Sequence, residues 1–102
     1  ARIVHEEQFG PVAAVTTFES EEEAIEVSNR GDLALDAAVF TADYDRARDM
    51  ADELDAGAVR INGAPSHGIG DIPFGGNKAS GIGRQGLHLT IEEMVRQKSI
   101  IL

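Results

Sequence analysis

The densest run of glycine lies in the second half of the chain and sets the strongest limit on its fold. Between Gly63 and Gly86 the sequence holds eight of its eleven glycines and two of its three prolines. Within this stretch, residues 73 to 84 read PFGGNKASGIGR and combine small residues with two cations and one aromatic ring. Glycine allows tight turns and a close approach of the backbone to a ligand or a neighbouring element. Because long ordered loops in small domains are usually functional, we expect this segment to form a site or to frame one.

Size and composition limit the chain to one domain or a part of one. Its 102 residues, 42% of them hydrophobic, can bury a single modest core. The sequence has no cysteine, which excludes disulfides, a thiolate zinc site and a cysteine nucleophile. It has neither an apolar run long enough to span a membrane nor a basic-then-apolar leader, so we expect no membrane partner and a cytoplasmic location.

The net charge of −9 is distributed unevenly. Residues 1 to 57 carry fifteen acids and four bases, or −11, and residues 58 to 102 carry three acids and five bases, or +2. Nucleic-acid binding requires a dense cationic stripe that releases counterions, and neither half supplies one. We therefore expect no nucleic-acid partner. The acidic run from Glu19 to Glu26 is interpreted as the solvated face of a helix in preference to a docking site for a basic partner.

Strand and helix patterns alternate along the first part of the chain. Residues 12 to 18 are nearly continuous in β-branched, small and aromatic side chains, which predicts a strand buried on both faces. Ser20 and Glu23 have the spacing of a capping box, so a helix is predicted to begin there and to end at Gly31 in a left-handed turn. Residues 37 to 41 are predicted to form a second strand.

The following elements complete a pattern typical of a parallel sheet. Apolar residues between positions 47 and 54 recur at helical spacing, which predicts a helix from about Asp43 to Gly57. Residues 58 to 62 are predicted to form a third strand. Strands that alternate with helices through short connections indicate right-handed crossovers, so the predicted fold class is α/β.

The end of the chain repeats the helix-start pattern. Thr90 and Glu93 have the spacing of a second capping box, which predicts a short helix. Residues 99 to 102 are then expected to form a final strand, which must find a pairing partner.

Three other motifs suggest dinucleotide binding, a metal site or a hydrolase triad, but the residues around each motif argue against that function. Residues 81 to 86 have G-x-G-x-x-G spacing, but a loop precedes them and no acidic residue follows at the distance that holds a ribose. The three histidines share no ligand spacing, so no metal site is predicted. Ser66, His67 and Asp71 have the residue types of a hydrolase triad, but neighbours in sequence cannot readily aim at one another.

Two motifs together resemble those of a known family. Residues 6 to 11 read EEQFGP, and residues 73 to 84 are the glycine-rich segment. In this order and at this separation they resemble the C-terminal part of the catalytic domain of NAD(P)-dependent aldehyde dehydrogenases. The resemblance implies that residues 1 to 102 form a parallel-sheet, three-layer segment of that domain. It also implies a small aldehyde substrate, NAD or NADP as cofactor, and a homo-oligomer in which residues 97 to 102 are a candidate oligomerisation strand.

The resemblance assigns roles to four residues, and the glycine-rich stretch adds His67 as a fifth candidate. Glu7, the second glutamate of the first motif, is expected to bind the ribose hydroxyls of the nicotinamide half, and Phe9 to fix the face of the nicotinamide. The alternative is a solvated acid beside a packed ring. Phe74 is expected to line the aldehyde tunnel, where an apolar wall excludes water. Gly68 lies near a place where many relatives have a bulky substrate-contacting residue, and His67 beside it is a polar loop group in reach of a substrate.

Other positions refine the resemblance. Lys78 and Arg84 match a lysine and an arginine of the family and are interpreted as loop and interface anchors. Arg60 replaces a residue that is usually apolar in the third strand. Residues 85 to 99 look most like the branch that acts on lactaldehyde or carries out non-phosphorylating oxidation of glyceraldehyde 3-phosphate.

Two hypotheses follow for the function. The first is a fragment of an oxidoreductase that oxidises an aldehyde to a carboxylic acid with NAD(P)+. The catalytic cysteine is missing from this chain, so the chain alone is expected to be inactive and to hold no catalytic residue. The second is a free-standing, non-catalytic α/β interaction module. The length of the source gene distinguishes the two.

Overall fold

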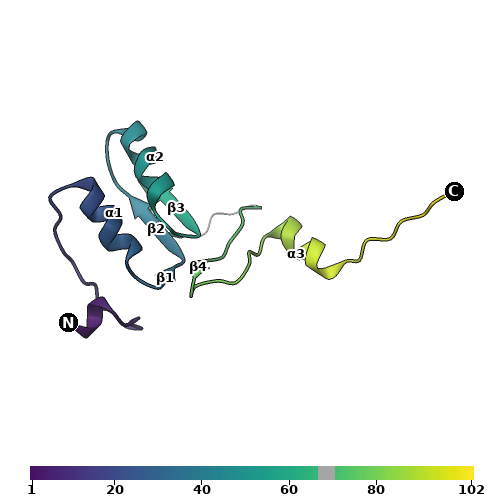
Figure 1. Ribbon diagram of the computed structural model, residues 1–102, viewed down its shortest axis with the longest axis horizontal. Helices are drawn as coiled ribbons and strands as arrows, with labels where there is room; N and C mark the ends of the chain where they lie inside the picture. Colours follow the sequence, from purple (N-terminus) through teal and green to yellow (C-terminus); the bar gives the residue numbers. More distant parts are fainter. Residues whose placement is uncertain (67–70) are drawn as a thin grey trace.

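A computed structural model describes residues 1–66 and 71–102. Its centre is a parallel strand–helix–strand unit of β2 (Asp36–Val39), α2 (Tyr44–Glu53) and β3 (Ala58–Ile61). The register runs from Asp36 opposite Ala58 to Val39 opposite Ile61. Figure 1 shows this unit beside α1 (Glu21–Asn29), which precedes it in the chain. The predicted crossover is therefore confirmed, with each strand within two residues of its expected bounds.

The start of α1 follows the predicted capping box. Ser20 Oγ accepts a hydrogen bond of 3.2 Å from Glu23 N, and Glu23 Oε2 accepts one of 2.8 Å from Glu19 N. The helix ends at Asn29, and its C-cap Arg30 has right-handed helical angles. Gly31 does not adopt a positive φ, so the predicted left-handed stop is wrong. A lysine from a distant part of the chain satisfies the last carbonyls instead, as described below.

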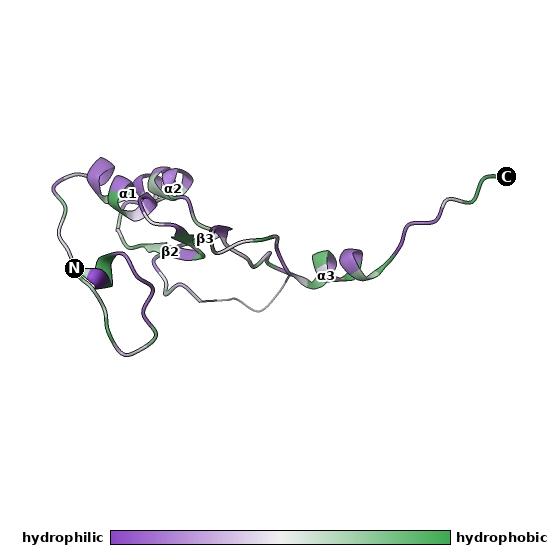
Figure 2. Ribbon diagram, turned by 60° about the horizontal axis from the view of Figure 1, so that its bottom comes forward, coloured by the Kyte–Doolittle hydropathy of each residue, from purple (hydrophilic) through white to green (hydrophobic). Residues whose placement is uncertain are grey.

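Helix α2 is capped by Asp43, whose Oδ1 accepts a hydrogen bond of 3.1 Å from Arg46 N. Ala47 on this helix is fully buried, which agrees with the apolar stripe in its sequence. The helix ends at Glu53, four residues before the predicted end, because Leu54 is already extended. In Figure 2, α1 and α2 lie on the same side of the β2–β3 sheet.

A second, short pairing joins segments that are far apart in sequence. β1 (Leu33–Ala34) pairs antiparallel with β4 (Asn77–Lys78), with Leu33 opposite Lys78. Ala34 N also donates a hydrogen bond of 2.9 Å to Ser80 Oγ. This pairing attaches the glycine-rich segment to the end of α1. No sequence pattern predicts it, because each of the two strands has only two residues.

The core of the described residues is small. The buried apolar residues are Ile25, Ala34, Val39 and Ala47. The radius of gyration is 17.4 Å, whereas a compact domain of this length has about 13 Å. Figure 1 shows the reason: α3 (Leu87–Met94) and the C-terminal residues extend away from the sheet, and the longest dimension reaches 65 Å. Most large apolar side chains outside the central unit are therefore exposed.

Two predicted strands do not form. Residues 12 to 18 and 99 to 102 belong to no strand, and their side chains are exposed. A strand is stabilised by ladder hydrogen bonds to a neighbour. No segment among the described residues pairs with either stretch, so β-forming sequence alone does not produce a strand there.

Helix α3 begins at Leu87, earlier than the predicted capping box. Thr90 therefore lies inside the helix, where its N–H donates a hydrogen bond of 2.8 Å to Gly86 O. The exposed N–H at the helix start is satisfied from elsewhere, because His88 N donates one of 3.1 Å to Asp71 Oδ1. The helix is present as predicted, but its N-cap is Gly86, and a carboxylate seventeen positions away from His88 accepts a hydrogen bond from the first turn of the helix.

Candidate functional site

The glycine-rich segment folds closely against the central unit. A Cβ atom on Gly57 would lie 1.7 Å from the carbonyl oxygen of Gly75. Gly75 has a φ of 159°, and a Cβ atom there would lie 2.3 Å from Gly83 O. The backbones of the two segments are thus in direct contact. This explains why small residues are concentrated here: side chains at these positions would separate the loop from the sheet.

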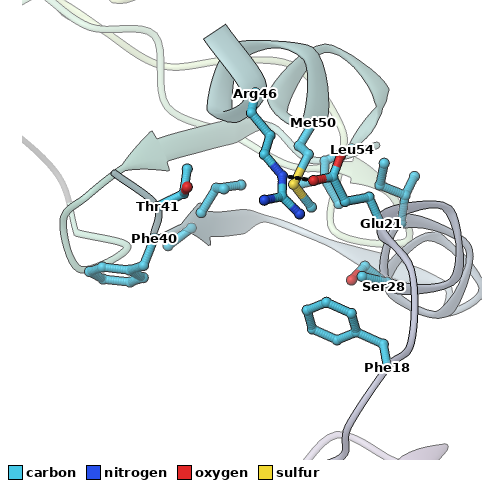
Figure 3. Close-up of a pocket in the computed structure, with 12 residues that line it drawn as sticks. Phe18, Glu21, Ser28, Phe40, Thr41, Arg46, Met50 and Leu54 are labelled. Carbon is cyan, nitrogen blue, oxygen red and sulfur yellow. Dashed lines mark ion pairs between the residues drawn. The ribbon is translucent and has the colours of Figure 1, made fainter. Parts of the chain in front are cut away.

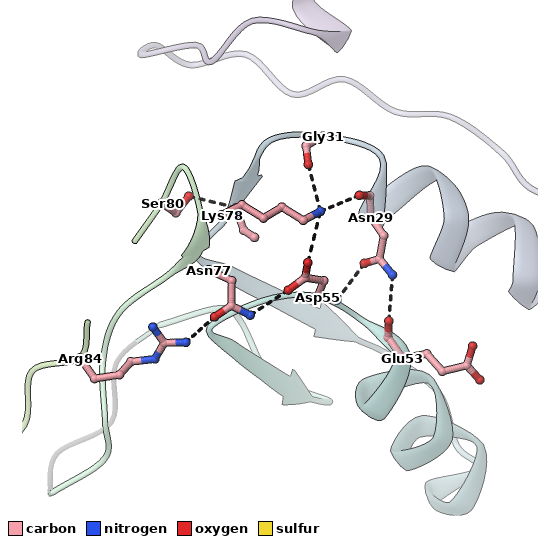
Figure 4. A network of polar contacts seen from close by, with 9 residues as sticks. Asn29, Gly31, Glu53, Asp55, Asn77, Lys78, Ser80 and Arg84 are labelled. Atoms are coloured by element: carbon pink, nitrogen blue, oxygen red, sulfur yellow. Dashed lines mark hydrogen bonds and ion pairs between the residues drawn. The ribbon is translucent and has the colours of Figure 1, made fainter. Parts of the chain in front are cut away.

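A network of polar side chains anchors the same segment, as Figure 4 shows. Lys78 Nζ donates hydrogen bonds of 2.6 Å to Asn29 O and 3.0 Å to Gly31 O, and lies 3.5 Å from Asp55 Oδ2. An ammonium group at the C-terminus of α1 satisfies its last carbonyls and complements the helix dipole. Lys78 is therefore a loop anchor, as its family position suggests.

Asn77 and Asn29 extend this network to the end of α2. Asn77 Nδ2 donates a hydrogen bond of 2.8 Å to Asp55 Oδ1, and Asn29 Oδ1 accepts one of 2.8 Å from Asp55 N. The hydrogen bond from Asn77, followed by the charge of Lys78, lowers the pKa of Asp55 below its ordinary value. No local sequence pattern indicates this role for either asparagine, because it depends on contacts between residues more than twenty positions apart.

Arg84 anchors the other end of the glycine-rich segment. Its Nη1 donates a hydrogen bond of 2.8 Å to Gly76 O, and its Nη2 contacts Asn77 Oδ1. Both contacts remain inside the segment, so Arg84 holds the loop in its own shape. Its expected role as a loop anchor agrees with this geometry.

Phe74 lies where the loop returns toward α3. Its backbone forms two hydrogen bonds of 2.7 Å with Gln85, one in each direction. The side chain is half-buried and lines a cavity of about 360 Å³. This cavity is mostly apolar; its other members include Val59, Arg60 and Ser66. The tunnel role expected for Phe74 stays a prediction.

Glu6 and Glu7 have different surroundings. Glu6 forms a two-pronged ion pair with Arg2 at 2.9 and 2.7 Å, and this contact lowers the pKa of Glu6. Glu7 makes no hydrogen bond or ion pair to any residue that the structure describes. It borders a cavity of about 510 Å³ that also includes Asn29 and Ser80. Of the two carboxylates, only Glu7 has its oxygens available to a ligand.

The expected site residues do not all come together. Phe9 lies two positions after Glu7 and is 96% exposed. Glu7 and Phe74 border different cavities. His67 and Gly68 lie outside the described residues. The described residues of the expected site thus lie in two separate groups: Glu7 with Phe9 near the N-terminus, and Phe74 with its apolar wall beside β3.

A further cavity, of about 390 Å³, lies between the helices and β2. Figure 3 shows Phe18 below it and Met50 above it, with an ion pair between Arg46 of α2 and Glu21 of α1. The rest of the lining is mostly apolar, with the hydroxyl groups of Ser28 and Thr41, and it holds no further titratable pair placed for catalysis. We interpret this cavity as a gap between packed elements.

Other site types find no support in the described part of the chain. No group of three or more histidine and acidic side chains there could hold a metal ion. Asp71, one member of the discounted triad, contacts His88 instead, through the side chain and the backbone N–H. These contacts lower the pKa of Asp71. No described helix is long and apolar enough to cross a membrane.

Comparison with known proteins identifies the family. A model of the aldehyde dehydrogenase family matches residues 1 to 100. The chain belongs to the aldehyde dehydrogenase family. It is 41% identical over 96 residues to a lactaldehyde dehydrogenase of Methanococcus maripaludis, an alignment that covers 94% of this chain and 21% of that protein. It is 43% identical over 99 residues to a succinate-semialdehyde dehydrogenase [NADP(+)] of Deinococcus radiodurans, covering 97% of this chain and 20% of that protein.

A solved structure agrees with these sequence relatives. The betaine aldehyde dehydrogenase of Staphylococcus aureus in complex with NAD+ superposes with a TM-score of 0.84 and 43% sequence identity. The match covers 90% of this chain and 18% of that one. This aldehyde dehydrogenase family chain therefore spans about a fifth of the length of its relatives. The family resemblance and the α/β class inferred from the sequence are confirmed.

Proposed function

We propose that this chain is the C-terminal segment of the catalytic domain of an NAD(P)-dependent aldehyde dehydrogenase, whose intact form oxidises an aldehyde to a carboxylic acid. The observation that carries the proposal is the family match over residues 1 to 100. Relatives named for NADP+ and solved with NAD+ support a nicotinamide cofactor. The lactaldehyde relative supports a small polar aldehyde as substrate.

Glu7 and Phe9 have the chemistry that binding of the cofactor requires. A carboxylate without a partner among the described residues can accept hydrogen bonds from both hydroxyls of a ribose. Glu7 is such a carboxylate. The exposed ring of Phe9, two residues away, supplies a flat apolar surface for the nicotinamide. A nicotinamide cofactor held there would supply the hydride acceptor for the oxidation of the aldehyde. Glu7 and Phe9 serve to orient the acceptor, because small misplacements of reacting atoms are costly.

Phe74 and its apolar wall have the chemistry that binding of the substrate requires. Phe74 is assigned to the aldehyde tunnel, together with His67 and Gly68, which precede it in sequence; an apolar wall there keeps water away from the reacting carbon. The chain has no cysteine, so the nucleophile of the family must come from another part of the protein. The chain by itself is expected to be inactive. Cytoplasmic location and a homo-oligomer that uses residues 97 to 102 stay predictions, to be checked by fractionation and sedimentation of the intact protein.

The decisive experiment substitutes Glu7→Gln in the intact enzyme. Glutamine keeps the shape but replaces charge-assisted acceptors, at a cost of about 1.5 to 3 kcal/mol. Hydride transfer should slow roughly ten- to a hundredfold, and a substrate deuterated at the aldehyde carbon should show a larger isotope effect. Glu6→Gln is the matched control, because Glu6 is already paired with Arg2. Equal turnover, cofactor affinity and isotope effect in wild type and Glu7→Gln would overturn the cofactor role.

The rival hypothesis remains a free-standing α/β interaction module. A source gene of several hundred codons supports the enzyme, and one of about a hundred codons supports the module.

A further inference from the structure

Arg60 is a cation in a cavity that is otherwise mainly apolar. It lies on β3, and the cavity of about 360 Å³ that it lines also includes Phe74, Ile72 and Pro73. Arg60 is itself exposed, so its guanidinium stays in contact with solvent at this cavity and is accessible to a charged ligand. Among the described residues Arg60 has no ion pair; its one hydrogen bond goes from Nη2 to the carbonyl oxygen of Ser66.

The sheet register places Arg60 on the face away from the helices. Val39 is buried and pairs with Ile61, so both point to the same side of the sheet. Val39 also borders the cavity between α1, α2 and β2. Since side chains alternate along a strand, Arg60 points to the opposite side, which agrees with its exposure between half-buried Val59 and Ile61. The guanidinium therefore belongs to the Phe74 cavity and not to the helix-covered core.

The turn after β3 fixes the direction of this side chain. A Cβ atom on Gly63 would lie 2.7 Å from Arg60 Cδ and 3.1 Å from Arg60 Cγ. The arginine stem thus lies across Gly63, and its head reaches Ser66. A guanidinium group has five N–H donors in a planar fork. The single carbonyl contact leaves most of them available for a two-pronged contact with an anion.

Asp36 borders the same cavity and must be considered, because its charge opposes that of Arg60. The register sets Asp36 opposite Ala58, two positions before Arg60, so it lies about 7 Å further back along the strands. It also has an interaction of its own. Arg60 lies toward the carboxyl ends of β2 and β3, the edge at which ligands bind in open α/β sheets. The cation is therefore the charge nearer to an incoming ligand.

From this geometry we infer that Arg60 is a specificity-determining residue that selects aldehydes carrying a carboxylate or phosphate group at the end remote from the reacting carbon. The inference rests on the proposed function and narrows its substrate class. The apolar wall around Phe74 contacts the carbon chain of the substrate, and the guanidinium binds the terminal anion in two-pronged geometry.

The test uses the intact enzyme with three substrates: succinic semialdehyde, glyceraldehyde 3-phosphate and the neutral pentanal. Arg60→Met should lower kcat/KM about ten- to a hundredfold for the anionic aldehydes and leave pentanal nearly unchanged. Arg60→Lys should recover part of the loss, because it keeps the charge without the fork. The relative loss for carboxylate and phosphate identifies which anion the site prefers. Arg48→Met, an exposed arginine on α2, is the control for general charge effects.

A second variant perturbs the same interaction indirectly. Gly63→Ala should displace the Arg60 stem and reduce the preference for anions in the same direction, by a smaller factor. If Arg60→Met does not fold, Gly63→Ala is used in its place to compare kcat/KM for the anionic aldehydes and pentanal. Equal losses for pentanal and the anionic aldehydes, or none, would overturn the inference and leave the proposed function intact: Arg60 would then only hold the turn through Ser66. A wild-type enzyme that oxidises none of the three aldehydes would overturn the proposed function and, with it, this inference.

Discussion

The central unit and the two ends of the chain differ in how their polar and apolar groups are satisfied. In the unit formed by α1, β2, α2 and β3, both helices have side-chain N-caps and the strands form a ladder. Residues 12 to 18 and 95 to 102 are also rich in apolar residues, as the central unit is. Their side chains are nevertheless exposed, and their backbones pair with no described strand. A strand-forming local sequence thus forms a strand only where the chain also supplies a neighbouring strand to pair with it.

Hydrogen exchange should show the largest contrast between the two regions. In the isolated chain, the amides of β2 and β3 should exchange about a thousandfold more slowly than those of residues 12 to 18, because only the former are in a ladder. In the intact protein this difference should largely disappear, as the ends gain partners. The measurement is exchange followed by mass spectrometry on both samples. Equal protection of residues 12 to 18 in the two samples would contradict the comparison.

The contact of the glycine-rich segment with the central unit can be broken with a single methyl group. Gly57→Ala would place a Cβ atom 1.7 Å from Gly75 O, and the required backbone shift should destabilise the intact protein by about 3 kcal/mol. Thermal unfolding measures this loss. Gly31→Ala is the matched control, because its Cβ atom would meet nothing within 4 Å. Similar melting temperatures for Gly57→Ala and wild type would show that the loop does not pack as described.

A smaller effect should appear where the loop meets α3. The side chain of His88, and then its backbone N–H, lower the pKa of Asp71 below its ordinary value. A carboxyl group whose pKa is depressed in the folded state stabilises the fold at any pH above its pKa in the unfolded state. This contribution is lost as the pH falls through the pKa of the folded state. The loop–α3 contact should therefore weaken as the pH falls below about 4. The amide chemical shift of His88 in the intact protein follows this titration. Asp71→Asn should abolish it, and an unchanged titration in that variant would exclude Asp71 as its source.

Several local features of this chain could be predicted from single residues. Ser20 with Glu23 and Asp43 mark the starts of α1 and α2, because a cap acts within three positions of itself. The apolar stripe around Ala47 predicts the face of α2 that is buried. The two motifs at residues 6 to 11 and 73 to 84 were sufficient to predict the family. For the site, the same motifs indicate Glu7, Phe9 and Phe74, and the roles of these residues remain proposals.

Errors arose where a local pattern depends on distant partners. Residues 12 to 18 have strong β-forming sequence, but a strand requires a neighbour, and none exists among the described residues. Gly31 was expected to end α1 through its own backbone, but Lys78 caps that helix from 49 positions away. Similarly, Thr90 and Glu93 have the spacing of a cap, whereas the helix already begins at Leu87 and the carboxylate of Asp71 accepts a hydrogen bond from His88 N, two residues before Thr90.

The sequence by itself determined the family, the α/β class, the central crossover and the absence of a cysteine nucleophile from this chain, because these follow from composition, short-range spacing and motif order. Only the tertiary structure decided that Glu6 is paired while Glu7 is available, that Asn29 and Asp55 anchor the glycine-rich segment, and that Arg60 shares a cavity with Phe74. These relations join residues on different elements. Register and close backbone packing bring them together, and neither is encoded in the spacing of residues along the chain.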